Sequence, residues 1–145
     1  MKAWYEKYLG KPWRGVGNPP HSFNCGDLVK YVYKHELGIE MPSVWANASS
    51  LREALANLSM PEAYGFEPYE GDPRPFDLCF VQRNVRRDHV AIVVQTVSGL
   101  MFLHSVSGCG VILETAFEMK ATTGTTYMEY RRHKDLTLEQ ALCHA

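Results

Sequence analysis

The sequence lacks a long apolar run, an excess of charge of one sign, and a secretory leader. No apolar stretch approaches the roughly 18 residues of a membrane-spanning helix, so no membrane insertion is expected. The 15 basic and 16 acidic side chains leave a net charge of −1. That balance argues against a nucleic-acid partner bound through a broad basic surface. The first residues have no apolar segment of the signal-peptide kind, so we expect synthesis in the cytoplasm without a signal peptide.

Cysteine is scarce, and the cysteines form no C-x-x-C pair. The usual signatures of zinc ribbons and thioredoxin-like motifs are therefore missing, and no H-x-x-x-H pair replaces them, so we expect no metal and no other cofactor. Without a secretion signal, a disulfide framework is not expected either. Most of the four are expected to be small buried hydrophobic side chains: Cys25, Cys79, Cys109 and Cys143.

The remaining composition is that of a folded domain. The chain has 145 residues, of which 46 % are hydrophobic and 12 % aromatic, which excludes a disordered or fibrous chain and predicts one domain over residues 1–145. Proline and glycine gather between residues 60 and 76, predicting a long irregular connection and a candidate cover for a cleft. Helical patterns precede this connection and strand patterns follow it. This order predicts an α+β fold, with N-terminal helices packed on a C-terminal antiparallel sheet of about five strands.

The individual elements follow from periodicity and from their ends. Helices are predicted over residues 2–9, 24–37 and 51–59. Strands are predicted over residues 78–81, 89–95, 100–106, 111–115 and 126–132. The spacing of Thr137 and Gln140 is that of a capping box and indicates a short last helix.

Cys25 differs from the other cysteines because it falls in the first turn of the predicted helix over 24–37. A loop rich in glycine and proline precedes it, and Ser22 or Asn24 is the expected N-cap. The positive end of the helix favours a thiolate, which is the attacking species in cysteine catalysis. Because Cys25 shares a helix face with Leu28 and Val29, a buried structural cysteine remains the alternative at this point.

A nucleophilic cysteine needs a base, usually a histidine held by a third group. His89 and His104 each lie in an otherwise apolar predicted strand. If Gln95 pairs with Leu100, His104 falls opposite Ala91, and the two histidines become diagonal neighbours on one face, with Cα atoms about 7–8 Å apart. This separation suits a base and the residue that orients it. The alternatives are a surface residue at a strand entry for His89 and a core residue for His104.

The motifs around these residues resemble those of the NlpC-type papain-like cell-wall peptidases, which are related to CHAP amidases. Residues 12–29 contain P-W-R-G-V-G and F-N-C-G-D-L-V, similar to the family's P-Y-x-x-G-G and F-D-C-S-G-L-V. Residues 38–42 are similar to the G-x-x-L-P of phage-coded members. Residues 76–78, 89–93 and 103–105 are similar to its G-D-L, H-V-G-I-Y and I-H-A. The ordered set covers about residues 10–115.

The resemblance implies a compact papain-like fold with Cys25 as nucleophile, His89 as general base and acid, and His104 as the residue that orients His89. Members cleave the peptide stems of bacterial peptidoglycan, so these stems are the implied substrate. The chemistry would be acyl transfer to sulfur followed by hydrolysis. The backbone N–H of Cys25 is the implied oxyanion donor, with Trp13 and Asn24 as candidate substrate-binding or oxyanion residues.

Several residues depart from the family pattern, and Gly17 stands one position beyond the family's usual G-G. Asn24 stands where aspartate is usual, Asp27 where glycine is usual, and Trp13 where tyrosine is usual. A carboxylate at Asp27 is expected to oppose a thiolate at Cys25, and the Trp13 indole can donate a hydrogen bond but not accept one.

The missing signal peptide bears on the expected setting. The protein would act at the cell wall as part of a phage tail, or after export by a secretion carrier, and these would be its partner proteins. The alternatives to a phage-tail peptidase are an interbacterial amidase toxin, a non-catalytic tail or scaffold module, and an acyltransferase that uses the same residues.

Overall fold

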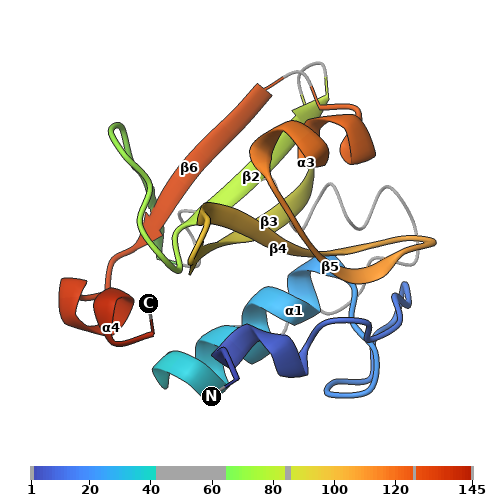
Figure 1. Ribbon diagram of the computed structural model, residues 1–145, viewed down its shortest axis with the longest axis horizontal. Helices are drawn as coiled ribbons and strands as arrows, with labels where there is room; N and C mark the ends of the chain where they lie inside the picture. Colours follow the sequence, from blue (N-terminus) through green and yellow to red (C-terminus); the bar gives the residue numbers. More distant parts are fainter. Residues whose placement is uncertain (1, 42–64, 84–85, 126, 145) are drawn as a thin grey trace.

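A single antiparallel sheet forms the centre of the computed structural model, which describes residues 2–41, 65–83, 86–125 and 127–144. Its strand order is β1-β6-β2-β3-β4-β5, and Figure 1 shows the strands from β6 to β5. The strands are β1 (Phe66–Pro68), β2 (Leu78–Arg83), β3 (Arg86–Thr96), β4 (Gly99–Val106), β5 (Gly110–Glu114) and β6 (Tyr127–His133). The α+β class and the five predicted strands are confirmed, and β1 is a sixth.

The strand β1 lies inside the connection predicted to be irregular. It pairs with β6 from Phe66↔His133 to Pro68↔Arg131 and forms one edge of the sheet. Proline has no N–H for a neighbouring strand, so Pro68 suits an edge. The prediction of an irregular segment over residues 60–76 is therefore wrong for β1, while residues 60–64 and the predicted helix over 51–59 lie outside the described residues.

The helix α1 (Cys25–Val32) continues into a π-helical turn, η2 (Tyr33–Leu37), and Gly38 ends it in the left-handed conformation at φ 69°. Together they confirm the predicted helix over 24–37. The apolar face of α1 packs against β3 and β4 and is almost completely buried at Leu28, Val29 and Val32. Burying a side chain of this size contributes about 1.5–3 kcal/mol, so this face anchors the helix to the sheet.

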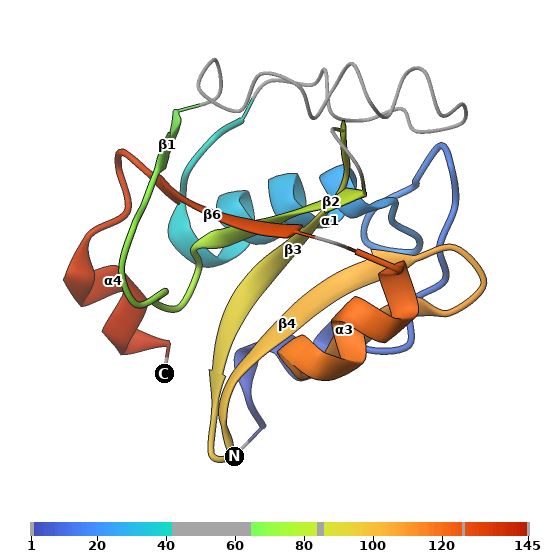
Figure 2. The same ribbon diagram turned by 90° about the horizontal axis from the view of Figure 1, so that it is seen from above.

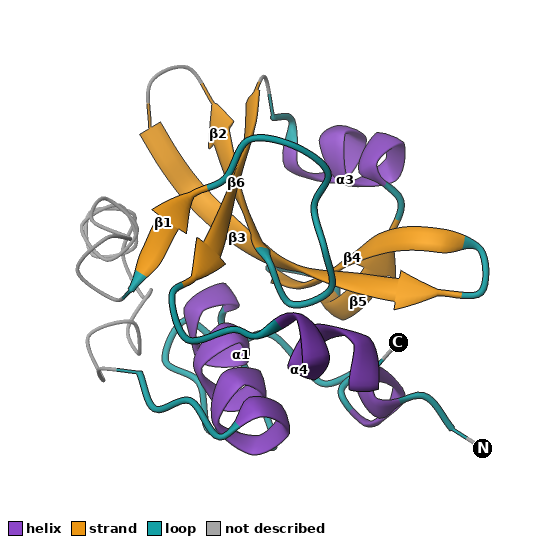
Figure 3. Ribbon diagram, turned by 90° about the vertical axis from the view of Figure 1, so that its left-hand side faces the viewer, coloured by secondary structure: helices purple, strands orange, loops and turns teal. Residues whose placement is uncertain are grey.

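Two layers of side chains fill the two faces of the sheet. Along β3, Val90, Ile92 and Val94 point to the layer that includes α1, whereas Ala91 and Val93 point to the other layer. The second layer lies under α3 (Ala116–Thr123), which covers the opposite face in Figures 2 and 3. A strand covered on both faces is apolar at successive positions, which explains the unbroken run of apolar residues in β3.

The helices outside α1 follow the sequence less closely. The predicted helix over 2–9 is only a 3-10 turn, η1 (Trp4–Lys7). The sequence prediction missed α3, because that helix buries only Met119 and has little apolar periodicity; its signal was the capping box of Thr115 and Glu118. The last helix, α4 (Leu138–Cys143), has the predicted capping box of Thr137 and Gln140.

Cysteine burial departs from expectation at two of four positions. Cys25 and Cys79 are buried, but Cys109 and Cys143 are exposed, and all four are free thiols. The expectation that most are buried is therefore wrong for Cys109, in the turn between β4 and β5, and for Cys143, at the end of α4. None of the described helices is long and apolar enough to span a bilayer.

Candidate active site

The start of α1 is fixed by a reciprocal capping box. The Oδ1 atom of Asn24 accepts a hydrogen bond from the Asp27 backbone N–H at 2.8 Å, and Asp27 Oδ2 accepts one from the Asn24 backbone at 3.3 Å. Asn24 is thus the N-cap, and Cys25 is the first helical residue, with 8 % of its surface exposed.

The loop before α1 is bound closely to this cap. The Asn24 amide donates to the Gly15 carbonyl at 3.0 Å, and Trp13 forms a parallel bridge with Phe23. Asn24 is fully buried, and its amide is bonded both to the helix and to the loop, so its described contacts are structural. Trp13 is half-buried beside the segment that leads to Cys25. Direct roles of Trp13 and Asn24 towards a substrate stay predictions.

Gly17 allows the loop before α1 to lie close to the capping box of the helix. A Cβ atom at Gly17 would lie 2.0 Å from Asp27 Oδ2 and 3.1 Å from the Ser22 carbonyl oxygen. The Gly17 backbone also bonds to the Asp27 carboxylate, and this bond partly offsets the rise in the pKa of Asp27 that burial causes. The Asp27 carboxylate therefore joins the loop to the helix cap.

Replacing Gly17 by alanine is expected to lower the free energy of unfolding by about 1–2 kcal/mol, because the new methyl group pushes Asp27 out of the capping box. Urea denaturation measures the change. The matched control is the same substitution in an Asp27→Ala background, where the closest clashing atom is gone and the cost should shrink. An equal cost in both backgrounds would count against the clash with Asp27.

The two strand histidines lie in direct contact. The pairing of Gln95 with Leu100 is as predicted, and His89 Nε2 lies 2.7 Å from His104 Nδ1. The described pairs between β3 and β4 end at Ile92↔Leu103, so both histidines lie beyond the last pair. A bulge next to His89 adds one residue to β3 opposite β2, a feature that re-aims side chains near active sites.

Cys25 joins the histidines through the backbone of β3. Its thiol accepts a hydrogen bond from the backbone N–H of Val90, the residue that follows His89. On the other strand, the Ser105 hydroxyl donates to the Phe23 carbonyl oxygen at 2.7 Å in a buried bond. Ser105 follows His104, and Phe23 lies two residues before Cys25. The strands β3 and β4, which carry the two histidines, are therefore each hydrogen-bonded to the segment at the start of α1.

Burial raises the pKa of the Cys25 thiol to about 11. The backbone N–H of Gly26 lowers this pKa, as expected at a helix start, and so does the backbone N–H of Val90 in β3. The Asp27 carboxylate raises it, as its position predicted. The start of the helix thus favours a thiolate, as expected, but the loss of solvation outweighs this effect on the pKa. Formation of the thiolate needs a partner that accepts the proton.

A further carboxylate, absent from the sequence prediction, lies behind His104. Glu114 Oε1 lies 2.7 Å from His104 Nε2, and Glu114 Oε2 accepts a hydrogen bond from the Thr122 hydroxyl at 2.6 Å. Burial lowers the pKa of His104, and Glu114 opposes this in part. The hairpin register was the missed signal: Phe102 pairs with Glu114, which makes Glu114 a diagonal neighbour of His104 on the same face.

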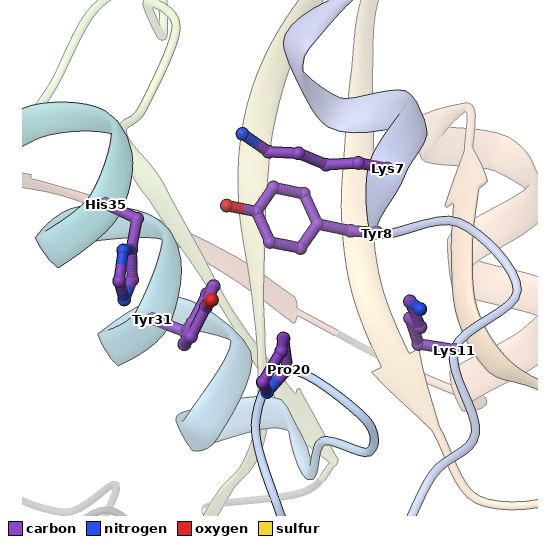
Figure 4. Close-up of a pocket in the computed structure, with 6 residues that line it drawn as sticks. All are labelled: Lys7, Tyr8, Lys11, Pro20, Tyr31 and His35. Atoms are coloured by element: carbon purple, nitrogen blue, oxygen red, sulfur yellow. The ribbon is translucent and has the colours of Figure 1, made fainter.

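A separate hollow of about 330 Å³ lies beside η1 and the end of α1 (Figure 4). Two of its lining residues contact Glu36: the Glu36 carboxylate accepts a hydrogen bond from the Tyr8 hydroxyl at 2.8 Å and pairs with the Lys7 ammonium at 2.5 Å. The hollow is lined by Lys7, Tyr8, Lys11, Pro20, Tyr31 and His35. None of the predicted site residues is among them. Across the described part of the chain, no three His, Cys, Asp or Glu side chains are grouped to hold a metal ion.

The model of the NlpC/P60 family matches residues 10–132, from the loop before α1 into β6. No curated protein matches the chain. The matched range contains the start of α1, both strand histidines and Glu114.

Proposed function

The chain belongs to the NlpC/P60 family, and from this membership we propose that it is a cysteine peptidase or amidase that hydrolyses the peptide stems of bacterial peptidoglycan. The observation that carries the proposal is the 2.7 Å contact between His89 Nε2 and His104 Nδ1, next to the strand residue whose N–H bonds to the Cys25 thiol. A nucleophile, a base and the group that orients the base are the parts that this chemistry needs.

The proposal gives each nitrogen of His89 its own role. Because Nε2 contacts His104, Nδ1 is the nitrogen proposed to exchange a proton with Cys25. In the proposed reaction, the Cys25 thiol gives its proton to His89 while the sulfur attacks the scissile carbonyl carbon. The C–N bond then breaks as His89 returns the proton to the leaving amine. Water cleaves the thioester and restores the thiol.

The negative oxygen of the tetrahedral intermediate needs hydrogen-bond donors. The backbone N–H of Cys25, at the N-terminal end of α1, is the proposed main donor. The Trp13 indole N–H, in the bridged segment beside Phe23, is the proposed second donor. Asn24 supports this arrangement by holding the start of the helix.

The test is digestion of purified peptidoglycan, followed by identification of the released fragments by mass spectrometry. Fragments with new ends inside the peptide stems would support the proposal, and the masses would name the bond. Fragments cut only in the glycan, or no release at all, would contradict it. Products in which a stem acyl group is joined to an added amine would favour an acyltransferase, and inactivity of the purified protein would favour a scaffold module.

The dependence of Cys25 on His89 gives a prediction about pH. Burial raises the pKa of Cys25 to about 11, so a Cys25 without its base holds its proton at neutral pH. In a His89→Ala variant, alkylation of Cys25 by iodoacetamide should become at least about tenfold slower at pH 7, and its rate should keep rising with pH well above neutrality.

Mass spectrometry of the Cys25 peptide measures this rate, in chains where the exposed Cys109 and Cys143 are serine. His35→Ala, which removes an exposed histidine from η2, is the matched control and should leave the profile unchanged. An unchanged profile in His89→Ala would mean that His89 is not the proton acceptor.

The place of action is also a proposal. Peptidoglycan lies outside the cytoplasm, so the protein would reach it on a phage tail or through a secretion carrier. Neighbouring tail genes would favour the phage setting, and a neighbouring immunity gene would favour an interbacterial toxin.

A further inference from the structure

The side chains of His89, His104 and Glu114 form a chain of hydrogen bonds, which ends at the Glu114 carboxylate. A carboxylate that is ionised can only accept hydrogen bonds, so the His104 nitrogen that faces Glu114 Oε1 at 2.7 Å must carry the proton. The other carboxylate oxygen is occupied by the Thr122 hydroxyl at 2.6 Å, which fixes the orientation of the carboxylate.

The direction of the next bond follows from the first. A neutral His104 with its proton on Nε2 presents a lone pair on Nδ1. The contact of 2.7 Å from this Nδ1 to His89 Nε2 then requires that His89 Nε2 carries a proton and donates it. A neutral His89 with its proton on Nε2 has its lone pair on Nδ1, which is the form that accepts the proton of Cys25.

The strand β5 and the helix α3 fix the position of Glu114 next to His104. Glu114 is the last residue of β5, and the residue after it, Thr115, is the N-cap of α3. Its partner Thr122 lies in the last turn of the same helix. The strand and both ends of α3 thus support the carboxylate, and His104 is completely buried beneath it.

We propose that Glu114 is a positioning residue that fixes the tautomers of both histidines, so that the working unit is Cys25–His89–His104–Glu114 rather than the first three residues alone. The proposal rests on the proposed function for the roles of Cys25 and His89. The assignment of tautomers itself rests only on the contacts of Glu114, His104 and His89.

The test measures first the tautomers of His89 and His104 and then the rate of peptide cleavage. Nitrogen NMR of histidine-labelled protein at pH 7 should show His89 and His104 both neutral and both protonated on Nε2. In Glu114→Gln, the side-chain amide offers either an oxygen or an NH₂ group to His104, and in Glu114→Ala the acceptor is gone. Both variants should show a new population of His104 protonated on Nδ1. Their kcat should fall roughly 10- to 100-fold with KM within about twofold.

Glu118→Gln is the matched control. It removes a negative charge from the first turn of α3 and keeps the capping box, since glutamine also fits that position. Its tautomers and kcat should equal those of the parent protein. If Glu114→Ala does not fold, the Glu114→Gln variant and the parent spectrum still decide the matter.

The proposal is overturned if His104 in the parent is protonated on Nδ1 or on both nitrogens, or if neither Glu114 variant changes the tautomers. Failure of the proposed function gives a different result. In that case no stem peptide is cleaved by the parent protein, while the NMR spectra still show whether Glu114 fixes the two rings.

Discussion

Replacing Cys25 by alanine is expected to lower the release of stem-peptide fragments from peptidoglycan by at least roughly 10³-fold. In the proposed mechanism the sulfur atom forms the covalent intermediate, and the nearby Asp27 carboxylate cannot take its place because it is engaged by the backbone of Asn24 and Gly17. The fold should survive, because the substitution removes one buried sulfur and leaves the capping box of α1 intact. Fragment release measured by mass spectrometry gives the rate.

Two cysteine variants serve as controls for this prediction. Cys109→Ala removes an exposed thiol from the turn between β4 and β5, and Cys79→Ala removes a buried thiol from β2. Both should retain the rate of the parent protein, apart from any loss of folded protein in Cys79→Ala. Retained activity in a folded Cys25→Ala variant would exclude Cys25 as the nucleophile.

The second large effect is expected for stability. Asp77→Ala should lower the free energy of unfolding by about 3–5 kcal/mol, because it removes the carboxylate that neutralises the Arg132 guanidinium, and the Tyr69 ring on which Arg132 lies does not replace that charge. Arg132 donates from Nε and Nη2 to the two carboxylate oxygens of Asp77 at 2.8 and 2.7 Å, and Asp77 is completely buried. The Arg74 backbone N–H adds a third bond at 2.9 Å. The pair joins the start of β2 to β6.

Urea denaturation of three further proteins tests this expectation. In Asp77→Leu with Arg132→Met, both charges are gone, and the loss should be clearly smaller than in Asp77→Ala. Glu40→Ala breaks the exposed pair with Lys34, whose separation is 3.5 Å, and should cost no more than about 0.5 kcal/mol. A loss for Asp77→Ala as small as that for Glu40→Ala would show that the buried pair is not a main support of the sheet.

Phe76, the residue before Asp77, departs from the G-D-L motif of the family. Phe76 stands where the family motif has glycine, and its φ of 72° lies in the left-handed region that glycine adopts freely. A side chain there costs about 1–2 kcal/mol. Phe76 offsets that cost because it is fully buried and stacks on Trp4, with ring centroids 4.8 Å apart.

Features that depend on neighbours in the sequence were predictable. The helix that begins at Cys25 follows from a cap and an apolar period within a few residues of each other, and Gly38 ends it for a local conformational reason. The pairing of Gln95 with Leu100 follows from a short hairpin, whose turn sets the register. The shared face of His89 and His104 is a consequence of that register, and the family resemblance of their motifs agrees with it.

Features that depend on distant segments were decided only by the tertiary structure. The pairing of β1 with β6, the partner of Asp77 and the contact of Gly17 with Asp27 each depend on how separate segments pack. The raised pKa of Cys25 has the same origin, because it reflects how much solvent the packed sheet and helix exclude, which no local pattern encodes. Sequence alone thus identified Cys25, His89 and His104 as candidates, whereas three-dimensional packing raises the pKa of Cys25, lowers that of His104 and places Glu114 behind His104.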